Sequence, residues 1–136
     1  MSPHEILHPA GWARARGYAN GMAATGRLVF TGGLVGWNAD QAWESDDFAG
    51  QAAQALRNVV AVLACAGAGP DHLVRLTWYV TSKRAYLDSL PALGEAYREI
   101  VGRHYPAMAL VQVVALVEDR ALVEIEATAV IPEGTP

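Results

Sequence analysis

The chain has 136 residues, of which 52% are hydrophobic and 18% are charged, and this balance excludes an intrinsically disordered protein. The length suits one domain, so we expect residues 1–136 to form a single domain with its own core. The net charge of −4 and the lack of any large Lys/Arg cluster argue against nucleic acid as a partner.

The N-terminal residues, MSPHEILHPAGWARARG, lack a basic leader followed by an apolar stretch, so we expect no signal peptide. Apolar runs elsewhere are too short to cross a bilayer, so we expect no membrane partner. Cys65 is the only cysteine, which excludes an internal disulfide and suits a reducing compartment. These features predict a cytoplasmic protein in which Cys65 packs near a helix end.

Residues 18–33 carry apolar side chains on both sides of Thr25-Gly26, with a compact LVF run after the turn. This pattern predicts two strands joined by a tight hairpin. A glycine-rich exit follows the second strand, and residues 38–45 are then polar without a period.

A first helix is expected after Asp46 or Asp47, because either side chain can cap a helix N-terminus. The apolar positions that follow recur at helical spacing and are Phe48, Ala52, Ala55, Leu56, Val59, Leu63 and Ala66. Gly67 and Gly69 are expected to end this helix.

The second half of the chain reads as a strand, a helix and two further strands. The strand covers residues 73–80, and helical spacing covers residues 86–101, where Pro91 places the start of the helix nearby. The last two strands are expected at residues 107–116 and 121–131. The predicted order is β-β-α-β-α-β-β, an α+β fold with two helices on one face of a mixed sheet.

The sheet face without helices must meet water or another subunit. Alternation places Val74, Leu76, Trp78, Val80, Val123, Ile125, Ala127 and Ala129 on the helix side. The other face then carries Arg75, Thr77, Tyr79, Leu110, Glu124, Glu126 and Thr128. The run AMALVQVVAL is apolar on both faces, which indicates that the second face is partly buried by self-association.

Several segments together resemble the Rid family of reactive-intermediate deaminases, also called the YjgF family. They are FTGGLVGW, GQAAQALRNVVAVLACAGAG, DHLVRLTWYV, YPAMALVQV and VEIEATAV. The resemblance implies a chorismate-mutase-like fold, a homotrimer and small-molecule pockets between subunits. It also implies hydrolysis of enamines and imines to ketones and ammonia, without a cofactor.

At the position where the family holds the substrate carboxylate with an arginine, this chain has Met108. A thioether cannot replace the two charge-assisted bonds of a guanidinium. Gly32 stands where the family often has serine, and Gly94 where asparagine is frequent. Tyr18 and Glu124 do carry over from the family pattern.

Each candidate site residue has a functional and a structural interpretation. Glu124 could activate water and pass a proton to a departing amine, or could form an ion pair with Arg75 across the sheet. Tyr18 could donate a hydrogen bond in the pocket or pack at a subunit edge. Arg16 could supply the missing positive charge or be solvated. Met108 is expected to form a pocket wall, since a thioether has no proton to give.

The sequence shows no metal-ligand spacing among His4, His8, His72 and His104, so we expect no metal. His104 precedes the Tyr-Pro step and could border the pocket, but a surface role is favoured.

Two functions from different classes remain open. The first is hydrolytic deamination of a reactive enamine or imine, with a substrate other than a simple amino-acid-derived enamine. The alternative is a non-catalytic trimeric protein that binds a small metabolite. A ribonuclease is disfavoured by the acidic charge and the absence of a basic groove.

Overall fold

The computed structural model describes residues 2–134 and is built around a five-stranded mixed sheet. The strand order is β3-β7-β5-β6, with β4 also paired to β7. Strands β5 and β6 run parallel, and the other pairs are antiparallel. These strands are β3 (Gly26–Phe30), β4 (Leu34–Val35), β5 (Leu73–Val80), β6 (Ala107–Gln112) and β7 (Val123–Pro132).

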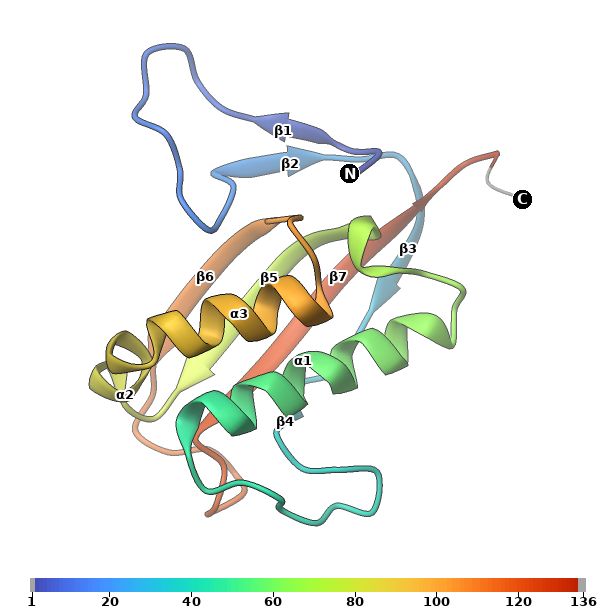
Figure 1. Ribbon diagram of the computed structural model, residues 1–136. Helices are drawn as coiled ribbons and strands as arrows, with labels where there is room; N and C mark the ends of the chain where they lie inside the picture. Colours follow the sequence, from blue (N-terminus) through green and yellow to red (C-terminus); the bar gives the residue numbers. More distant parts are fainter. Residues whose placement is uncertain (1, 135–136) are drawn as a thin grey trace.

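Helices α1 (Phe48–Ala64) and α3 (Leu90–Ile100) cover the same face of this sheet (Figure 1). The predicted α+β fold with two helices on one face is therefore confirmed. The structure adds the short helix α2 (Lys83–Asp88) and a 3-10 turn, η1 (Pro70–His72), which the sequence pattern did not reveal. None of the helices in residues 2–134 is long and apolar enough to cross a membrane.

Helix α1 begins and ends where the sequence predicts. The backbone N–H of Gly50 donates to Asp47 Oδ1 at 3.1 Å, so Asp47 is the cap. Gly67, with φ of +78°, adopts the left-handed conformation that glycine tolerates best and lies just past the helix. Cys65 is exposed, which corrects the expected packing role, because it lies at the helix end on the solvent side.

The second predicted helix is divided in two. Ser82 Oγ accepts from the backbone N–H of Ala85 at 3.1 Å and so caps α2. Helix α3 then begins at Leu90, with Pro91 in its first turn as predicted. Tyr86 of α2 and Leu90 and Leu93 of α3 line one cavity together with Met108 of the edge strand β6.

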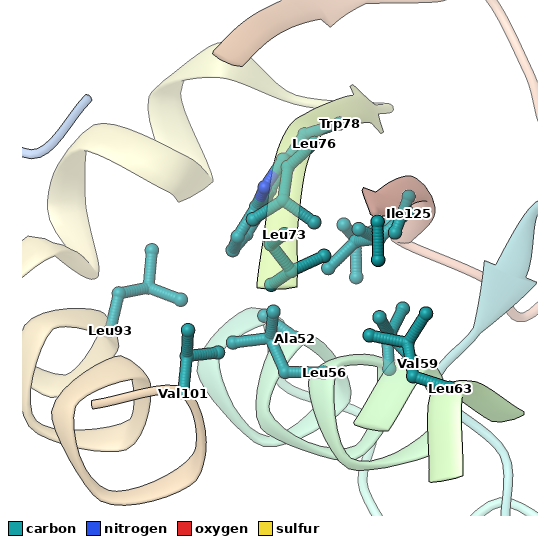
Figure 2. Close-up of a cluster of buried hydrophobic side chains, with 14 of the residues drawn as sticks. Ala52, Leu56, Val59, Leu63, Leu73, Leu76, Trp78, Leu93, Val101 and Ile125 are labelled. Carbon is teal, nitrogen blue, oxygen red and sulfur yellow. The ribbon is translucent and has the colours of Figure 1, made fainter. Parts of the chain in front are cut away.

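The core lies between the sheet and the two long helices (Figure 2). Its largest fully buried apolar side chains include Leu56, Leu63, Leu76 and Ile125. At the start of β5 the core residue is Leu73, which is 0% exposed, and not Val74 as alternation predicted. The cause is an irregularity in the β5–β7 pairing between residues 73 and 75, which changes the side-chain alternation there.

The predicted hairpin around residues 25–26 is wrong. Strand β2 (Gly21–Ala23) pairs with β1 (Glu5–Leu7) in a separate two-stranded sheet, while β3 pairs with β7. At Gly26 the backbones approach so closely that a Cβ atom would lie 2.0 Å from the carbonyl oxygen of Ile131. Both predicted strands form, but each finds its partner elsewhere because the turn does not bring them side by side.

Strand β6 faces the helices with a different set of residues than predicted. In the parallel ladder Met108 lies beside Leu76, and Leu110 lies beside Trp78, so both point to the helix side. Leu110 packs against the core, which corrects its assignment to the open face. Alternation assigned Leu110 to the wrong face because β6 is apolar on both faces.

A buried amide fixes the connection that leads into β7. Gln51 is 0% exposed and donates to the carbonyl oxygens of Ser45 and Arg120 at 3.2 and 2.9 Å. Its own oxygen accepts from the backbone N–H of Leu122 at 2.8 Å. Because each of these groups is satisfied by Gln51, the chain enters β7 in one register.

Candidate functional site

A cavity of about 130 Å³ lies where helices α2 and α3 approach the edge strand β6. Met108 on β6 lines it, together with Gly94 from α3 and Gly17 from the N-terminal segment. The other lining residues are aromatic or aliphatic: Trp78, Tyr86, Tyr97, Tyr105, Leu90 and Leu93. We call this space the Met108 cavity. Its walls carry no acid and no base among the described residues.

Trp78 has an unusual position in this wall. The side chain is 4% exposed, and its indole nitrogen Nε1 is a buried donor without a hydrogen-bond partner among residues 2–134. The Trp78 and Tyr86 rings meet edge to face, with centroids 6.4 Å apart. Alternation placed Trp78 in the core but did not reveal its role in the cavity. The sequence held one clue to this role, because a tryptophan in the core needs a hydrogen-bond acceptor for its indole N–H.

Two tyrosines of the Met108 cavity, Tyr97 and Tyr86, are held in the neutral form. Tyr97 donates from its hydroxyl to the carbonyl oxygen of His104 at 2.6 Å and stacks on Tyr105, with centroids 5.1 Å apart. Burial is the main cause that raises the pKa of Tyr97 well above its usual value. Burial also raises the pKa of Tyr86. The cavity therefore offers apolar surface and neutral hydroxyl groups.

Gly94 leaves room on the α3 side of the Met108 cavity. A Cβ atom at this position would meet only the Arg98 side chain, whose nearest atom would be 3.1 Å away. The missing side chain thus lets the Arg98 side chain lie close to the backbone of α3 at this position.

A larger cavity of about 590 Å³ adjoins the N-terminal segment, and Tyr18 lines it. Tyr105 lines both cavities, so they are neighbours. Tyr18 remains 42% exposed. The structure therefore places Tyr18 beside the Met108 cavity, and its chain neighbour Gly17 within that cavity.

His104 also lines the larger cavity, and the surface role favoured by the sequence is wrong. The side chain is 7% exposed, and its Nε2 lies 2.7 Å from the carbonyl oxygen of Leu73, to which the protonated nitrogen donates. Burial lowers the pKa of His104, although the bond to Leu73 opposes this effect. The prediction failed because Tyr-Pro neighbours give no signal of burial.

Glu124 lies on the opposite face of the sheet from Met108. It is half-buried, pairs with Tyr79 in the β5–β7 ladder and has its carboxylate directly over Gly33. A side chain at Gly33 would collide with that carboxylate, so this glycine gives Glu124 its space.

A tyrosine and a second acid lie beside Glu124. Tyr79 donates from its hydroxyl to Glu126 Oε1 at 2.8 Å. This hydrogen bond is the main cause that raises the pKa of Tyr79, and burial and the charges of Glu126 and Glu124 add to it.

The structural alternative for Glu124, an ion pair with Arg75, does not form within residues 2–134. Arg75 pairs with Thr128 in the ladder, and the ion pairs in the described chain are Arg84–Asp88 and Arg120–Asp46.

The two remaining candidate residues are exposed. Gly32 has open space around it, whereas its neighbour Gly33 touches Glu124. Arg16 lines neither of the two cavities. One chain thus brings Met108 and Gly94 together, sets Tyr18 next to them, and keeps Gly32 and Glu124 apart from them. Among the described residues no group of three His, Cys, Asp or Glu side chains could hold a metal ion.

Comparison with known proteins identifies the family. The family described as endoribonuclease L-PSP matches residues 11–131. The chain belongs to this family. TdcF of Escherichia coli K12, which is described as a candidate reactive intermediate deaminase, is 32% identical over 108 residues, covering 77% of this chain and 80% of TdcF. The resemblance to the Rid, or YjgF, family is therefore confirmed.

Solved structures agree with this assignment. A Rid family protein of unknown function from Yersinia pestis, YyfB, superimposes with a TM-score of 0.82 at 30% identity, covering 94% of this chain and 98% of YyfB. The structure of E. coli TdcF with bound serine gives a TM-score of 0.66 at 29% identity, covering 93% and 98% of the two chains. The α+β fold is shared with both family members.

Proposed function

We propose that this protein hydrolyses a reactive enamine or imine to a ketone and ammonia. The observation that carries the proposal is the Met108 cavity, which lies at the position where the family resemblance expects the substrate. Membership of the family and the similarity to TdcF support a reactive intermediate deaminase. A cytoplasmic location and a single domain over residues 1–136 stay predictions.

The active pocket is proposed to lie between subunits of a homotrimer. The sheet face without helices supports this, because Leu28 and Phe30 are 59% and 67% exposed on it and Val111 is 45% exposed. Apolar side chains at this density on one open face favour burial by another subunit. Light scattering at micromolar concentration should give three times the chain mass, and a monomer would contradict the proposed assembly.

A second subunit is needed because Glu124 and Met108 lie on opposite faces of their own sheet. We assign the binding wall to Met108 and Gly94 of one subunit, with Tyr18 beside them. Glu124 and Gly32 of the next subunit complete the pocket, with Gly33 holding the Glu124 carboxylate in place. Arg16 is exposed and lies near Tyr18 in sequence, so it is the candidate that would hold a carboxylate if the protein turned over a charged substrate such as 2-aminoacrylate.

The proposed reaction needs one water molecule and one group that moves protons. The Glu124 carboxylate accepts a proton from water as the water oxygen bonds to the imine carbon. Glu124 gives this proton to the nitrogen, which forms a carbinolamine. The carboxylate then takes the hydroxyl proton of the carbinolamine and passes it to the nitrogen as the C–N bond breaks and the C=O bond forms, so that ammonia leaves. An enamine first becomes an imine by protonation at carbon, and the overall change is addition of water and loss of ammonia.

The test is release of ammonia above the spontaneous rate. We expect catalysis with the imine of an apolar ketone, generated in place by an amine oxidase, and poor turnover of 2-aminoacrylate. Boiled protein and the oxidase alone are the controls. No acceleration with any enamine or imine would overturn the proposed activity.

A second candidate function is a trimeric protein that binds a small metabolite without turnover. The observation that favours it is the chemistry of the Met108 cavity, whose walls hold neutral and apolar side chains. Ligand binding without ammonia release would select this alternative. The acidic net charge of −4 gives no support to a ribonuclease, despite the family's description.

A further inference from the structure

The indole N–H of Trp78 is a donor that the protein itself leaves unused. A buried donor without an acceptor destabilises the folded state, and such groups are rare in folded proteins. The nitrogen is closed off from solvent, so bulk water does not supply the acceptor. In Figure 2 the nitrogen lies on the edge of the indole turned toward helix α2, whose Tyr86 also lines the Met108 cavity.

The size and the walls of the cavity limit what can use this donor. At about 130 Å³ the space is slightly smaller than the ~150 Å³ cavity that holds one benzene molecule. Tyr86, Tyr97 and Tyr105 offer ring surfaces, and Met108 offers a flexible thioether that packs well against aromatic rings. The fit is to one flat apolar group with a short extension.

The side chains that line the Met108 cavity also disfavour a charged ligand. A carboxylate in this cavity would lose its water without a basic side chain in the lining to replace it, and the nearby Arg98 guanidinium lies beside Gly94 outside the lining. One neutral acceptor, such as a carbonyl oxygen or an imine nitrogen, would instead satisfy the N–H of Trp78. The Trp78 nitrogen has almost no accessible surface, so a side chain of the wall must shift before the acceptor reaches it, and Met108 with its three rotatable bonds is the most flexible side chain of that wall.

We propose that the Met108 cavity binds a neutral, single-ring aromatic or similarly flat apolar ketone or imine, whose oxygen or nitrogen accepts a hydrogen bond from Trp78 Nε1. This inference rests on the proposed function, since it names the substrate class of the same pocket. Trp78 is thus a substrate-binding residue that determines specificity and does not move a proton.

The test uses acetophenone as the probe, a neutral aryl ketone of the product class. Ethylbenzene, which lacks the acceptor, and phenylglyoxylate, which adds a carboxylate, are the matched comparisons. Binding is followed by the indole N–H signals in the ¹H–¹⁵N NMR spectrum, where the four tryptophans give separate reporters. Trp78 is assigned through its ring contact with Tyr86, and Trp37→Phe is the control variant outside the cavity.

Acetophenone should move the Trp78 N–H signal downfield and saturate, whereas ethylbenzene should bind without the downfield shift. Trp78→Phe should weaken acetophenone binding about tenfold, the equivalent of one buried hydrogen bond, and leave ethylbenzene binding within about twofold. A Trp78 signal that does not respond to saturating acetophenone would overturn the inference. Equal or tighter binding of phenylglyoxylate would overturn it too. The wild-type spectrum decides the question if Trp78→Phe does not fold.

The ammonia assay keeps this inference separate from the proposed activity. A Trp78 response to acetophenone with no ammonia from any imine supports the ligand class and overturns the deaminase. Ammonia release, together with a Trp78 N–H signal that acetophenone does not change, supports the deaminase and overturns the ligand class.

Discussion

The Met108 cavity and the acidic residues Glu124 and Glu126 lie on opposite faces of one sheet and consist of opposite kinds of side chain. The cavity is lined by aromatic and aliphatic groups, one of which, Trp78, has an indole N–H without a hydrogen-bond partner among residues 2–134. The other face presents two carboxylates, one of which accepts a hydrogen bond from Tyr79. The proposed binding wall and the proposed proton-transfer group therefore cannot meet each other within one chain. This separation is the physical reason for proposing that the reaction takes place between subunits.

The largest expected effect comes from removing the proton-transfer group. Glu124→Gln should lower kcat for an apolar imine by roughly 10²–10⁴-fold, because an amide cannot accept a proton from water. Acetophenone binding should be unchanged, since the cavity is untouched. Ammonia release and NMR titration measure the two properties.

Glu126→Gln is the matched control, because it lies two residues away on the same face and contacts Tyr79. An equal loss of kcat in both variants would mean that general charge on this face, and not Glu124, supports the reaction.

A smaller change is expected from placing a charge in the binding wall. Met108→Arg should raise kcat/KM for 2-aminoacrylate by roughly 10- to 100-fold, since a guanidinium can hold the carboxylate with charge-assisted bonds. Met108→Leu keeps the wall apolar and should give no gain. Adding Glu124→Gln to Met108→Arg should remove the gain in ammonia release. If the wild type already turns over 2-aminoacrylate rapidly, Arg16 becomes the candidate that holds the carboxylate.

His104 should make the free energy of unfolding depend on pH. Burial lowers the pKa of His104 in the folded protein, so the unfolded chain binds the proton first as pH falls. The contribution of His104 should leave the free energy of unfolding at its full value above pH about 6.5, the pKa of histidine in the unfolded chain. Below that pH the free energy of unfolding should decrease by at most about 1.4 kcal/mol per pH unit. Urea unfolding between pH 7.5 and about 5 measures this slope.

His104→Gln should reduce that slope while keeping an N–H that can donate to Leu73. His8→Gln, at an exposed histidine, controls for the loss of a histidine as such. An unchanged slope in His104→Gln would assign the pH dependence to another group.

The smallest effect is expected on the open face, at Tyr79. Its hydrogen bond to Glu126 raises its pKa, so the stability from this contact is complete below pH about 10 and is lost as pH rises through the folded pKa. Glu126→Gln should move the ionisation of Tyr79 to lower pH, as followed by NMR of its ring. Glu124→Gln should move it less, because Glu124 acts on Tyr79 by charge alone. The reverse order would show that Tyr79 faces Glu124 in the assembled protein.

The sequence by itself determined the elements whose signals are local. Asp47 capped its helix and Pro91 marked the first turn of α3, because caps and proline act through the backbone of adjacent residues. The alternation of Val123, Ile125 and Ala127 assigned the faces of β7, since one face is polar and the register therefore has one solution. The family segments then indicated Met108 as the position of a site.

Only the tertiary structure decided the features that depend on partners distant in the chain. The pairing of β2 with β1 and the face of Leu110 were not readable, because a strand that is apolar on both sides fits either register. The burial of His104 and the unused N–H of Trp78 depend on what α2, α3 and β6 place around them. A cavity is the space that packed side chains fail to fill, so it is fixed only when the helices and the sheet are brought together.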